Sequence, residues 1–393
     1  MKRIPLTRPY FTGEELERIG RVLDSGWVTQ GPLVAEFEQA FARLTGSRHA
    51  LALNSCTAAL HLALLALNIS EDDEVIVPAF TFAASANVVE HCRARTVFCD
   101  IDPSTYTIDT NQIESCITPC TKAIMPVHLF GLSADMGNIL ELARKYGLAV
   151  IEDAACGFGC LYQGHHVGTL GDIGCFSFHP RKAITTGEGG MATTNSKDIA
   201  KRIQSLRDHG AVISDLDRHL SGRPYALPDM DEPGFNYRLT DIQAALGISQ
   251  LEKADTIQQA RRSWARRYDQ ALDDVSWLKA PVSPQGFVHG YQSYVCLFEP
   301  EKIDVKNVEY VNTRRNAFMD HLQTRGVASR PGTQAVHMLN YYKQRYNLKP
   351  ENYPHTLIAN LCSVTLPLYA DMTEDEFGYV MDAIKEFNPL CAG

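Results

Sequence analysis

The sequence predicts an α/β fold in which a large, mostly parallel sheet is followed by a smaller α+β domain. Through the first half of the chain, short unbroken apolar runs alternate with helical patterns, and several runs end in polar residues. Unbroken apolar runs are typical of strands covered on both faces, as in a doubly wound sheet. From about Val275 onward the strands become fewer and the helices more amphipathic. At 393 residues we expect two domains, a large one over residues 1–250 that includes the N-terminal helices and a small one over residues 251–393.

The predicted elements follow one another as a parallel α/β domain requires. A helix is expected to begin at Thr12, where Glu15 completes a capping box, and a second one covers residues 34–44. The strands expected next are residues 49–53, 74–78, 96–100, 122–127, 148–153, 173–178 and 191–194. The later helices expected are residues 58–67, 82–92, 136–146, 197–208, 239–268, 313–325 and 374–387, with a polar loop over residues 215–233.

Composition excludes several classes of function. The formal net charge is -9 and no block of lysine and arginine is present, so we expect no nucleic-acid partner. The N-terminus lacks the apolar stretch of a secretory signal, and no apolar run approaches the length of a membrane span, so no membrane association is expected. The 11 cysteines are scattered, and the closest pairs have three residues between them. They favour reduced thiols in a cytoplasmic protein over a zinc site.

One lysine, Lys182, follows a predicted buried strand in the stretch from Gly171 to Asn195. Small residues and a Thr/Gly-rich turn surround it, which is an unusual place for a purely structural ammonium group. A partly desolvated lysine loses its proton readily and can form a Schiff base with a carbonyl. The alternative is a surface lysine beside a flexible turn.

Other polar residues lie where predicted strands end, at the edge where ligands bind in such sheets. Ser55, Cys56 and Thr57 open an apolar helix whose N-terminus can hold a phosphate, or can simply be capped by Ser55. Asp153 ends an apolar strand and either points into a crevice or caps the next turn, while Ser177 alternates with two phenylalanines and faces away from them. Together with a reactive lysine, these groups are the set that pyridoxal 5'-phosphate (PLP) requires.

Longer motifs extend these single signals. They are the stretches over residues 25–32, 54–62, 77–82, 127–131, 151–155, 171–190, 234–238 and 366–369. With these motifs in this order, nearly the whole chain resembles the DegT/DnrJ/EryC1/StrS aminotransferases, the sugar-nucleotide aminotransferases of PLP fold type I. The resemblance implies an aspartate aminotransferase-like large domain.

The resemblance also implies roles for the residues that match the family's cofactor site. Lys182 matches the lysine that binds PLP covalently and carries the proton during amino transfer. Asp153 matches the acid that pairs with the pyridinium nitrogen. Phe82 matches the aromatic side chain that stacks on the cofactor ring.

The phosphate cup is implied by a second set of matching positions. Cys56, Thr57 and Ser177 match the residues of this cup, beside Ser55. Asn236 matches an asparagine that family dimers lend to the neighbouring subunit's phosphate, so the resemblance implies a homodimer with shared active sites.

The sequence departs from the family pattern at several positions. Cys56 replaces a common glycine without removing the backbone N–H, whereas Cys156 replaces the glutamine or histidine that contacts the ring oxygen of PLP. Arg181, next to Lys182, reaches either substrate phosphate or solvent. Trp27, in a turn flanked by Gly and Pro, and His337 are candidate substrate contacts that have packing roles as their alternatives.

The function implied by the resemblance is transfer of an amino group from an amino acid, by family resemblance L-glutamate, to a keto-sugar nucleotide in amino-sugar or polysaccharide biosynthesis. One alternative is a PLP- or pyridoxamine-dependent sugar dehydratase-deoxygenase. Members of that kind replace the lysine with histidine, so Lys182 counts against it. The other alternative is a non-catalytic regulatory member of the same fold.

Overall fold

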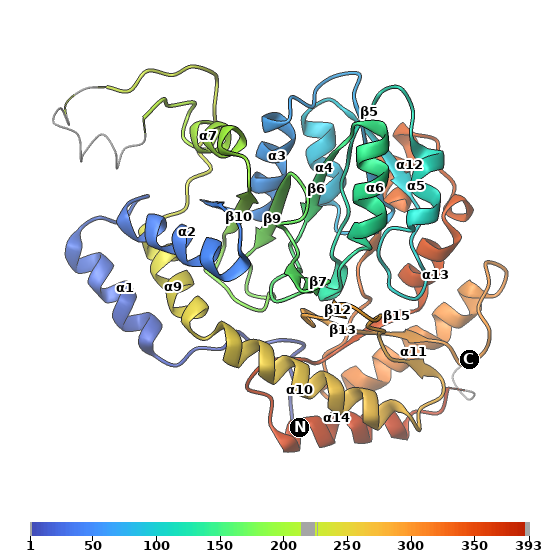
Figure 1. Cartoon of the computed structure of the whole chain (residues 1–393). Coiled ribbons are helices and arrows are strands. Elements are labelled where there is room, and N and C mark those ends of the chain that lie inside the picture. The colour runs from blue at the N-terminus through green and yellow to red at the C-terminus, as the bar shows by residue number, and fades with distance from the viewer. Residues whose placement is uncertain (1, 214–224, 226, 390–393) are drawn as a thin grey trace.

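The computed structural model describes residues 2–213, 225 and 227–389 and shows a large lobe and a smaller one (Figure 1). The large lobe is built on a seven-stranded sheet. Its strands, in spatial order, are β1 (His49–Leu53), β10 (Gly190–Thr194), β9 (Ile173–Ser177), β6 (Ala149–Asp153), β5 (Thr121–Ile124), β2 (Glu74–Pro78) and β4 (Arg95–Cys99). Only β10 runs against its neighbours in this sheet. The predicted α/β fold with a mostly parallel sheet is therefore confirmed.

Helices cover both faces of this sheet, which is why its strands are apolar throughout. The helices on one face are α3 (Cys56–Ala66), α4 (Ala84–His91) and α7 (Lys197–Leu206). Those on the other are α2 (Pro32–Thr45), α5 (Thr110–Cys116), α6 (Met136–Tyr146) and α9 (Asp241–Glu252). Phe37 and Phe41 of α2 pack against Phe176 and Phe178 from the strand side, with ring centroids 5.0 to 5.6 Å apart where they meet. This packing fixes the end of β9, from which the Lys182 loop departs.

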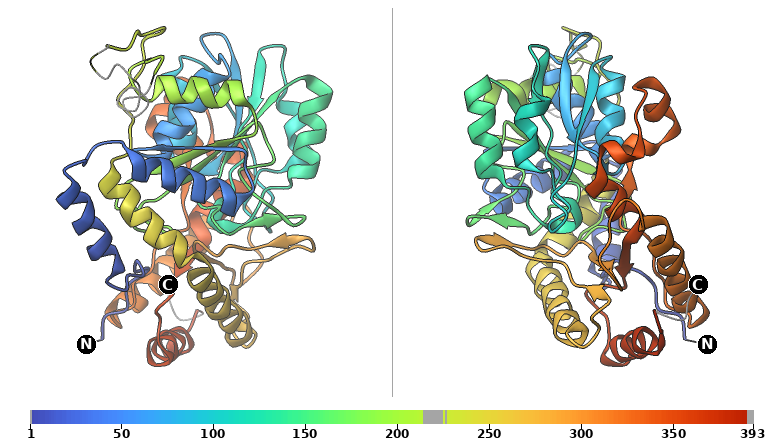
Figure 2. Two further views of the ribbon diagram at one scale, coloured as in Figure 1. Left: turned by 60° about the vertical axis from the view of Figure 1, so that its left-hand side comes forward. Right: turned by 90° about the vertical axis from the view of Figure 1, so that its right-hand side faces the viewer.

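The small lobe is built on a three-stranded antiparallel sheet of β11 (Leu278–Lys279), β13 (Tyr294–Phe298) and β15 (Ser363–Leu366). Around it lie α10 (Ala254–Leu272), α11 (Val308–Thr324) and α14 (Glu374–Glu386), which Figure 2 shows below the large sheet. The chain's first residues also belong here. Ile4 is buried in the core of this lobe, its N–H donates to the carbonyl of Gly326 (2.9 Å), and its carbonyl accepts from the N–H of Ala328 (3.0 Å).

Ile4 therefore packs with the small lobe, whereas the predicted large domain includes residues 1–250. The predicted division between residues 250 and 251 falls inside α9, whose last residue is Glu252. Shorter elements complete the fold. They are α1 (Glu14–Ser25), β3 (Phe80–Thr81), η1 (Leu129–Gly131), β7 (Leu161–Tyr162), β8 (His165–His166), β12 (Phe287–Val288), β14 (Gln334–Ala335), η2 (Val336–Met338), α12 (Asn340–Arg345), η3 (Pro350–Asn352) and α13 (Pro354–Cys362). The pairing of β14 with β3 joins the lobes directly beside Phe82.

Three helix predictions differ from the structure. The helix expected over residues 313–325 is α11, which begins five residues earlier, at Val308. The single helix expected over residues 239–268 is two helices that meet at Lys253, whose ammonium group binds Glu15 of α1. The first helix begins at Glu14, after Gly13 with φ 100°, so Glu15 accepts the N–H groups of Thr12 and Gly13 without a reciprocal cap from Thr12. The polar loop predicted over residues 215–233 lies partly outside the described residues. Within the described part of the chain, no helix combines the length and apolar character needed to span a bilayer.

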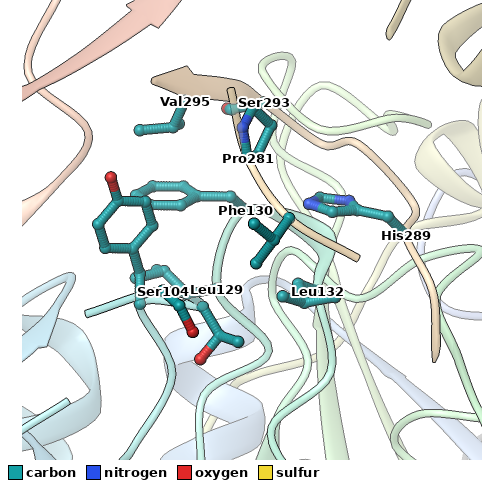
Figure 3. Close-up of a pocket in the computed structure, with 11 residues that line it drawn as sticks. Ser104, Leu129, Phe130, Leu132, Pro281, His289, Ser293 and Val295 are labelled. Atoms are coloured by element: carbon teal, nitrogen blue, oxygen red, sulfur yellow. The ribbon is translucent and has the colours of Figure 1, made fainter. Parts of the chain in front are cut away.

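The small cavity drawn in Figure 3 lies where the lobes meet, between the segment around Phe130 and the strand of Val295. Phe130 has φ 58° and packs its ring against Phe80 and Tyr106. Leu129, Leu132 and Pro281 make most of the remaining wall apolar. This cavity lies between the two packed lobes, and none of the predicted site residues lines it.

Candidate active site

The Lys182 side chain emerges from a tight turn just after β9. The Lys182 N–H donates to the carbonyl of His179 (2.8 Å), and Gly187, with φ 82°, turns the chain back toward β10. The half-buried ammonium group lies 3.2 Å from the Sγ atom of Cys156. It has no carboxylate partner among the described residues. An amine kept partly from water without a counter-charge is suited to covalent chemistry.

Asp153 ends β6 and is buried, with 4% of its surface exposed. One carboxylate oxygen accepts from the hydroxyl of Ser85 on α4 (2.7 Å), and the other accepts from the N–H of Ala155 (3.1 Å). The Ser85 hydroxyl is held in turn by Thr81, because the Oγ1 atom of Thr81 lies 3.0 Å from the Oγ atom of Ser85. A carboxylate oxygen has two lone-pair sites, so Asp153 keeps the capacity to accept from a cationic N–H.

The start of α3 is the predicted seat for a phosphate, because a helix N-terminus presents backbone N–H groups to an anion. The Ser55 hydroxyl caps this helix by accepting from the N–H of Ala58 (3.0 Å), as the alternative reading of Ser55 expected. Thr57 is exposed, while Cys56 is buried with its thiol directed at the carbonyl of Cys175 (3.5 Å). A Cβ atom on Gly190 would come within 2.4 to 2.5 Å of the Ser55–Cys56 backbone, so β10 passes directly beside this seat.

The remaining predicted cofactor residues lie around the same edge of the sheet. Ser177 is the last residue of β9 and is half-buried. Phe82 follows β3 and exposes 66% of its surface, which is unusual for a phenylalanine beside a crevice. Asn236 is exposed, and its carbonyl accepts from the side chain of Asn54 (3.4 Å), just before α3.

The predicted substrate residues have different surroundings. Arg181 is exposed and its carbonyl accepts from the amide of Gln292 (2.9 Å). Trp27 donates its indole N–H to the carbonyl of Gln30 (3.2 Å) in the turn before α2 and packs against Gly31. Their roles in substrate binding stay predictions.

His337 lies inside the protein, where 1% of its surface is exposed. Its Nε2 lies 3.3 Å from the carbonyl of Pro350, and its ring packs 4.5 Å from that of Tyr353. Burial lowers the pKa of His337 to about 4, although Pro350 and Asp100 oppose this effect. The imidazole is therefore neutral at pH 7, and its contact with substrate stays a prediction.

A polar group next to Asp153, centred on Glu152, was not predicted from the sequence. Glu152 lies on the opposite face of β6, is fully buried, and accepts a hydrogen bond from Nε2 of His128 (2.8 Å). The N–H groups of Gly168, Leu170 and Gly171 also donate to Glu152. Burial alone would raise the pKa of Glu152, but these donors hold it below its usual value. A carboxylate in the middle of an apolar strand was the available signal.

The tautomer of His128 follows from its second contact. The N–H of Ala134 donates to Nδ1 of His128 (3.1 Å), so the proton lies on Nε2 and is donated to Glu152. The pair fixes the turn that follows β6 and the segment leading into β9. Its role is to position the strands that carry Asp153 and Lys182.

The residues present fit PLP. A half-buried lysine without a counter-charge, a buried carboxylate with spare acceptor capacity, an exposed ring and a helix N-terminus meet at one edge of the sheet. Lys182 would hold the cofactor covalently, Asp153 its ring nitrogen, Phe82 its face and the start of α3 its phosphate. Fold and site together define the class of PLP-dependent enzymes of fold type I.

Comparison with known proteins identifies the group within this class. Residues 9–385 match the DegT/DnrJ/EryC1/StrS aminotransferase family, and the chain belongs to it. The enzyme is therefore a PLP-dependent aminotransferase, as the sequence resemblance predicted.

Named relatives cover nearly the whole chain. The spore coat polysaccharide biosynthesis protein SpsC of Bacillus subtilis is 35% identical over 98% of this chain and 96% of its own length. The putative sugar aminotransferase Spr1654 of Streptococcus pneumoniae, solved in its PMP form, has a TM-score of 0.88 at 28% identity and covers 98% of both chains. Helicobacter pylori PseC, an aminotransferase of pseudoaminic acid biosynthesis, also has a TM-score of 0.88, at 27% identity over 98% of this chain and 99% of its own.

Proposed function

We propose that this enzyme transfers the amino group of an amino acid, L-glutamate, to the keto group of a keto-sugar nucleotide in amino-sugar biosynthesis. The observation that carries the proposal is the Lys182 amine, held half-buried without a counter-charge at the sheet edge that Asp153 and α3 share. The sugar is supported by relatives, because SpsC is named for polysaccharide biosynthesis and PseC for pseudoaminic acid biosynthesis.

The chain's own residues divide the work of amino transfer. When bound, PLP supplies a carbonyl that exchanges amines and a ring that withdraws electrons from the reacting carbon. Lys182 moves a proton at Nζ, first from the donor's α-carbon and later to the sugar carbon that receives the amine. Asp153 keeps the ring nitrogen protonated through a carboxylate oxygen, and Phe82 covers one face and excludes water from it.

We also propose that the working form is a homodimer in which Asn236 completes the neighbouring subunit's phosphate seat. Asn236 is exposed, and exposed apolar side chains lie on nearby segments, namely Val212, Ile213, Leu227 and Met230. Such a cluster favours contact with another surface. Sedimentation analysis should give a dimer, and mixing inactive Lys182→Ala with inactive Asn236→Ala protein should restore part of the activity in hybrids. A monomer with full activity would refute the shared site.

The catalytic proposal is tested by absorbance and by product. Protein supplied with PLP should show a visible band that borohydride removes and that Lys182→Ala lacks. With L-glutamate and a panel of keto-sugar nucleotides, NMR should detect one aminated sugar nucleotide. A colourless protein that ignores added PLP would support the non-catalytic alternative. A product that lost a hydroxyl group without gaining an amine would support the deoxygenase.

A further inference from the structure

Two cysteine side chains contact each other at one edge of the large sheet. Cys99 ends β4, the edge strand, and Cys116 ends α5, which packs against that strand (Figure 1). Their thiols share a hydrogen bond. The Sγ atom of Cys116 also lies 3.9 Å from the carbonyl of Phe98, the residue before Cys99. That of Cys99 lies 3.8 Å from the carbonyl of Asp109, the N-cap of α5. Both residues therefore belong to one apolar cluster, as free thiols.

The two thiols differ in exposure and in acidity. Cys99 is buried, with 1% of its surface exposed, whereas Cys116 is half-buried. The hydrogen bond from Cys99 lowers the pKa of the Cys116 thiol, an effect that burial opposes and Ser115 supports. The same hydrogen bond, together with burial, raises the pKa of the Cys99 thiol. Cys116 is therefore the thiol that ionises first, and a thiolate is the form that reacts with peroxides. Cys99 is the protonated neighbour that can complete a disulfide.

The backbone of Cys99 is joined directly to a segment of the predicted cofactor site. Its carbonyl accepts from the N–H of Ala79 (2.8 Å), and the residues that follow Ala79 are β3 and then Phe82. Thr81, the second residue of β3, belongs to the chain of hydroxyl groups that ends on Asp153. A displacement of Cys99 therefore acts, through one backbone hydrogen bond, on the segment that places Phe82 and supports Asp153.

We propose that Cys99 and Cys116 are a reversible oxidation site, at which a peroxide closes a disulfide that weakens the binding of PLP. The Cys116 thiolate attacks one oxygen of hydrogen peroxide, the O–O bond breaks, hydroxide leaves, and a sulfenic acid forms. Cys99 then attacks the sulfenic sulfur, and its proton leaves with the sulfenic hydroxyl group as water. The two sulfur atoms have together given two electrons to the peroxide.

The disulfide changes the position of both elements that it joins. Its sulfur atoms are about 2.0 Å apart, much closer than two thiols that share a hydrogen bond. Closing the bond therefore draws the end of α5 and the end of β4 together and moves Cys99 relative to Ala79. A thiol reductant reverses the change by thiol–disulfide exchange. This site acts on cofactor binding and is independent of which sugar and which amino donor the enzyme uses.

Peptide mapping of the PLP-loaded enzyme after treatment with hydrogen peroxide tests for the disulfide. Trypsin leaves three cysteines, among them Cys99 and Cys116, in the peptide of residues 96–122. Cleavage after Glu114 then separates Cys99 from the other two. In oxidised wild type the two fragments should stay joined until dithiothreitol is added. The control Cys120→Ser, at the exposed third cysteine, should keep the link, and Cys116→Ser should lose it.

The second measurement is the Kd of PLP for the reduced and the oxidised enzyme. We expect the Kd to rise about fivefold on oxidation, as for one weakened backbone hydrogen bond, and to return with dithiothreitol. Cys116→Ser should keep its reduced-state Kd after peroxide, and so should Cys99→Ala as a second variant. Separate fragments in oxidised wild type, or joined fragments with an unchanged Kd, would overturn the proposal. So would an equal loss of affinity in Cys116→Ser, which would assign the effect to another thiol such as Cys156.

Discussion

Adjacent carboxylates on β6, Glu152 and Asp153, show how one strand serves both scaffold and site. Glu152 points to one face, where His128 and three backbone N–H groups donate to it and no water reaches it. Asp153 points to the other face, where Ser85 and one N–H leave acceptor capacity unused. The Glu152 carboxylate therefore has no acceptor capacity left, whereas the Asp153 carboxylate can still accept a hydrogen bond from a bound ligand.

The difference gives a rule for separating structural from functional polar groups in this protein. Buried polar groups without a full set of partners are costly to folding, and a bound ligand is one way to satisfy them. Lys182 shares this property with Asp153, and Glu152 and His128 do not. The two sets of residues should therefore respond differently to substitution.

The largest effect is expected from Lys182→Ala. Amino transfer should fall about 10⁴-fold, because both covalent attachment of PLP and proton transfer at Nζ are lost. Turnover assays and the visible absorption band measure the change, and the thermal midpoint should stay near that of wild type. The control is Lys201→Ala on the exposed side of α7, which should keep full activity. If Lys182→Ala retained a tenth of the activity, another residue would be the base.

Asp153→Asn should reduce activity about 10²- to 10³-fold with little loss of stability, since the amide keeps the contact with Ser85 but cannot support a protonated ring. Steady-state kinetics and urea denaturation give the two quantities. Comparable losses of stability and activity would remove the distinction between Asp153 and Glu152.

Glu152→Gln should show the reverse pattern. The free energy of unfolding should fall by about 3–5 kcal/mol, because a fully buried His128 and three N–H groups lose a charged acceptor. Activity per folded molecule should change much less. Urea titration measures the loss, and adding His128→Gln should cost less than the sum of the single changes, as for residues in contact. Strict additivity would mean that the pair does not act as a unit.

The smallest effect concerns His337, a buried base outside β6. Burial depresses its pKa to about 4 in the folded protein, against about 6.5 in the unfolded chain. As pH falls below 6.5 the unfolded state takes up the proton first, so stability is fully present above that pH and is lost toward pH 4. By pH 5 the free energy of unfolding has fallen by about 2 kcal/mol for this reason.

The test compares urea unfolding of wild type and His337→Gln at pH 7.5 and pH 5. The variant should lose less stability between the two values, because glutamine does not titrate. His166, whose pKa burial also lowers to about 4, is present in both proteins and cancels in this difference. Equal losses in both proteins would show that His337 does not titrate as proposed.

Much of the large lobe could be predicted because its elements are local patterns. The strand over residues 49–53 and the helix over residues 136–146 have the predicted bounds. The break at Lys253 was not predicted, because the helical pattern continues through it, and the ion pair of Lys253 with Glu15 joins residues far apart in the sequence. The position of Ile4 in the small lobe likewise depends on backbone pairing with Gly326 and Ala328, which lie far away in the sequence.

The same contrast between local patterns and long-range contacts applies to the candidate site. Lys182, Asp153 and the start of α3 could be identified because each follows a recognisable strand, and parallel strands bring their carboxyl ends together. The burial of His337 could not be predicted in this way, because it is produced by Tyr353 and Pro350 from the segment that follows.

The backbone pairing of Ile4 with residues 326–328 has a consequence for synthesis on the ribosome. The segment around Ile4 cannot be placed until residues 326–328 have been synthesised, whereas the sheet of the large lobe ends with β10 at Thr194 and can assemble much earlier. The nascent enzyme should therefore have a formed sheet and an unanchored segment around Ile4 for much of its translation. Closing this long loop comes late in folding.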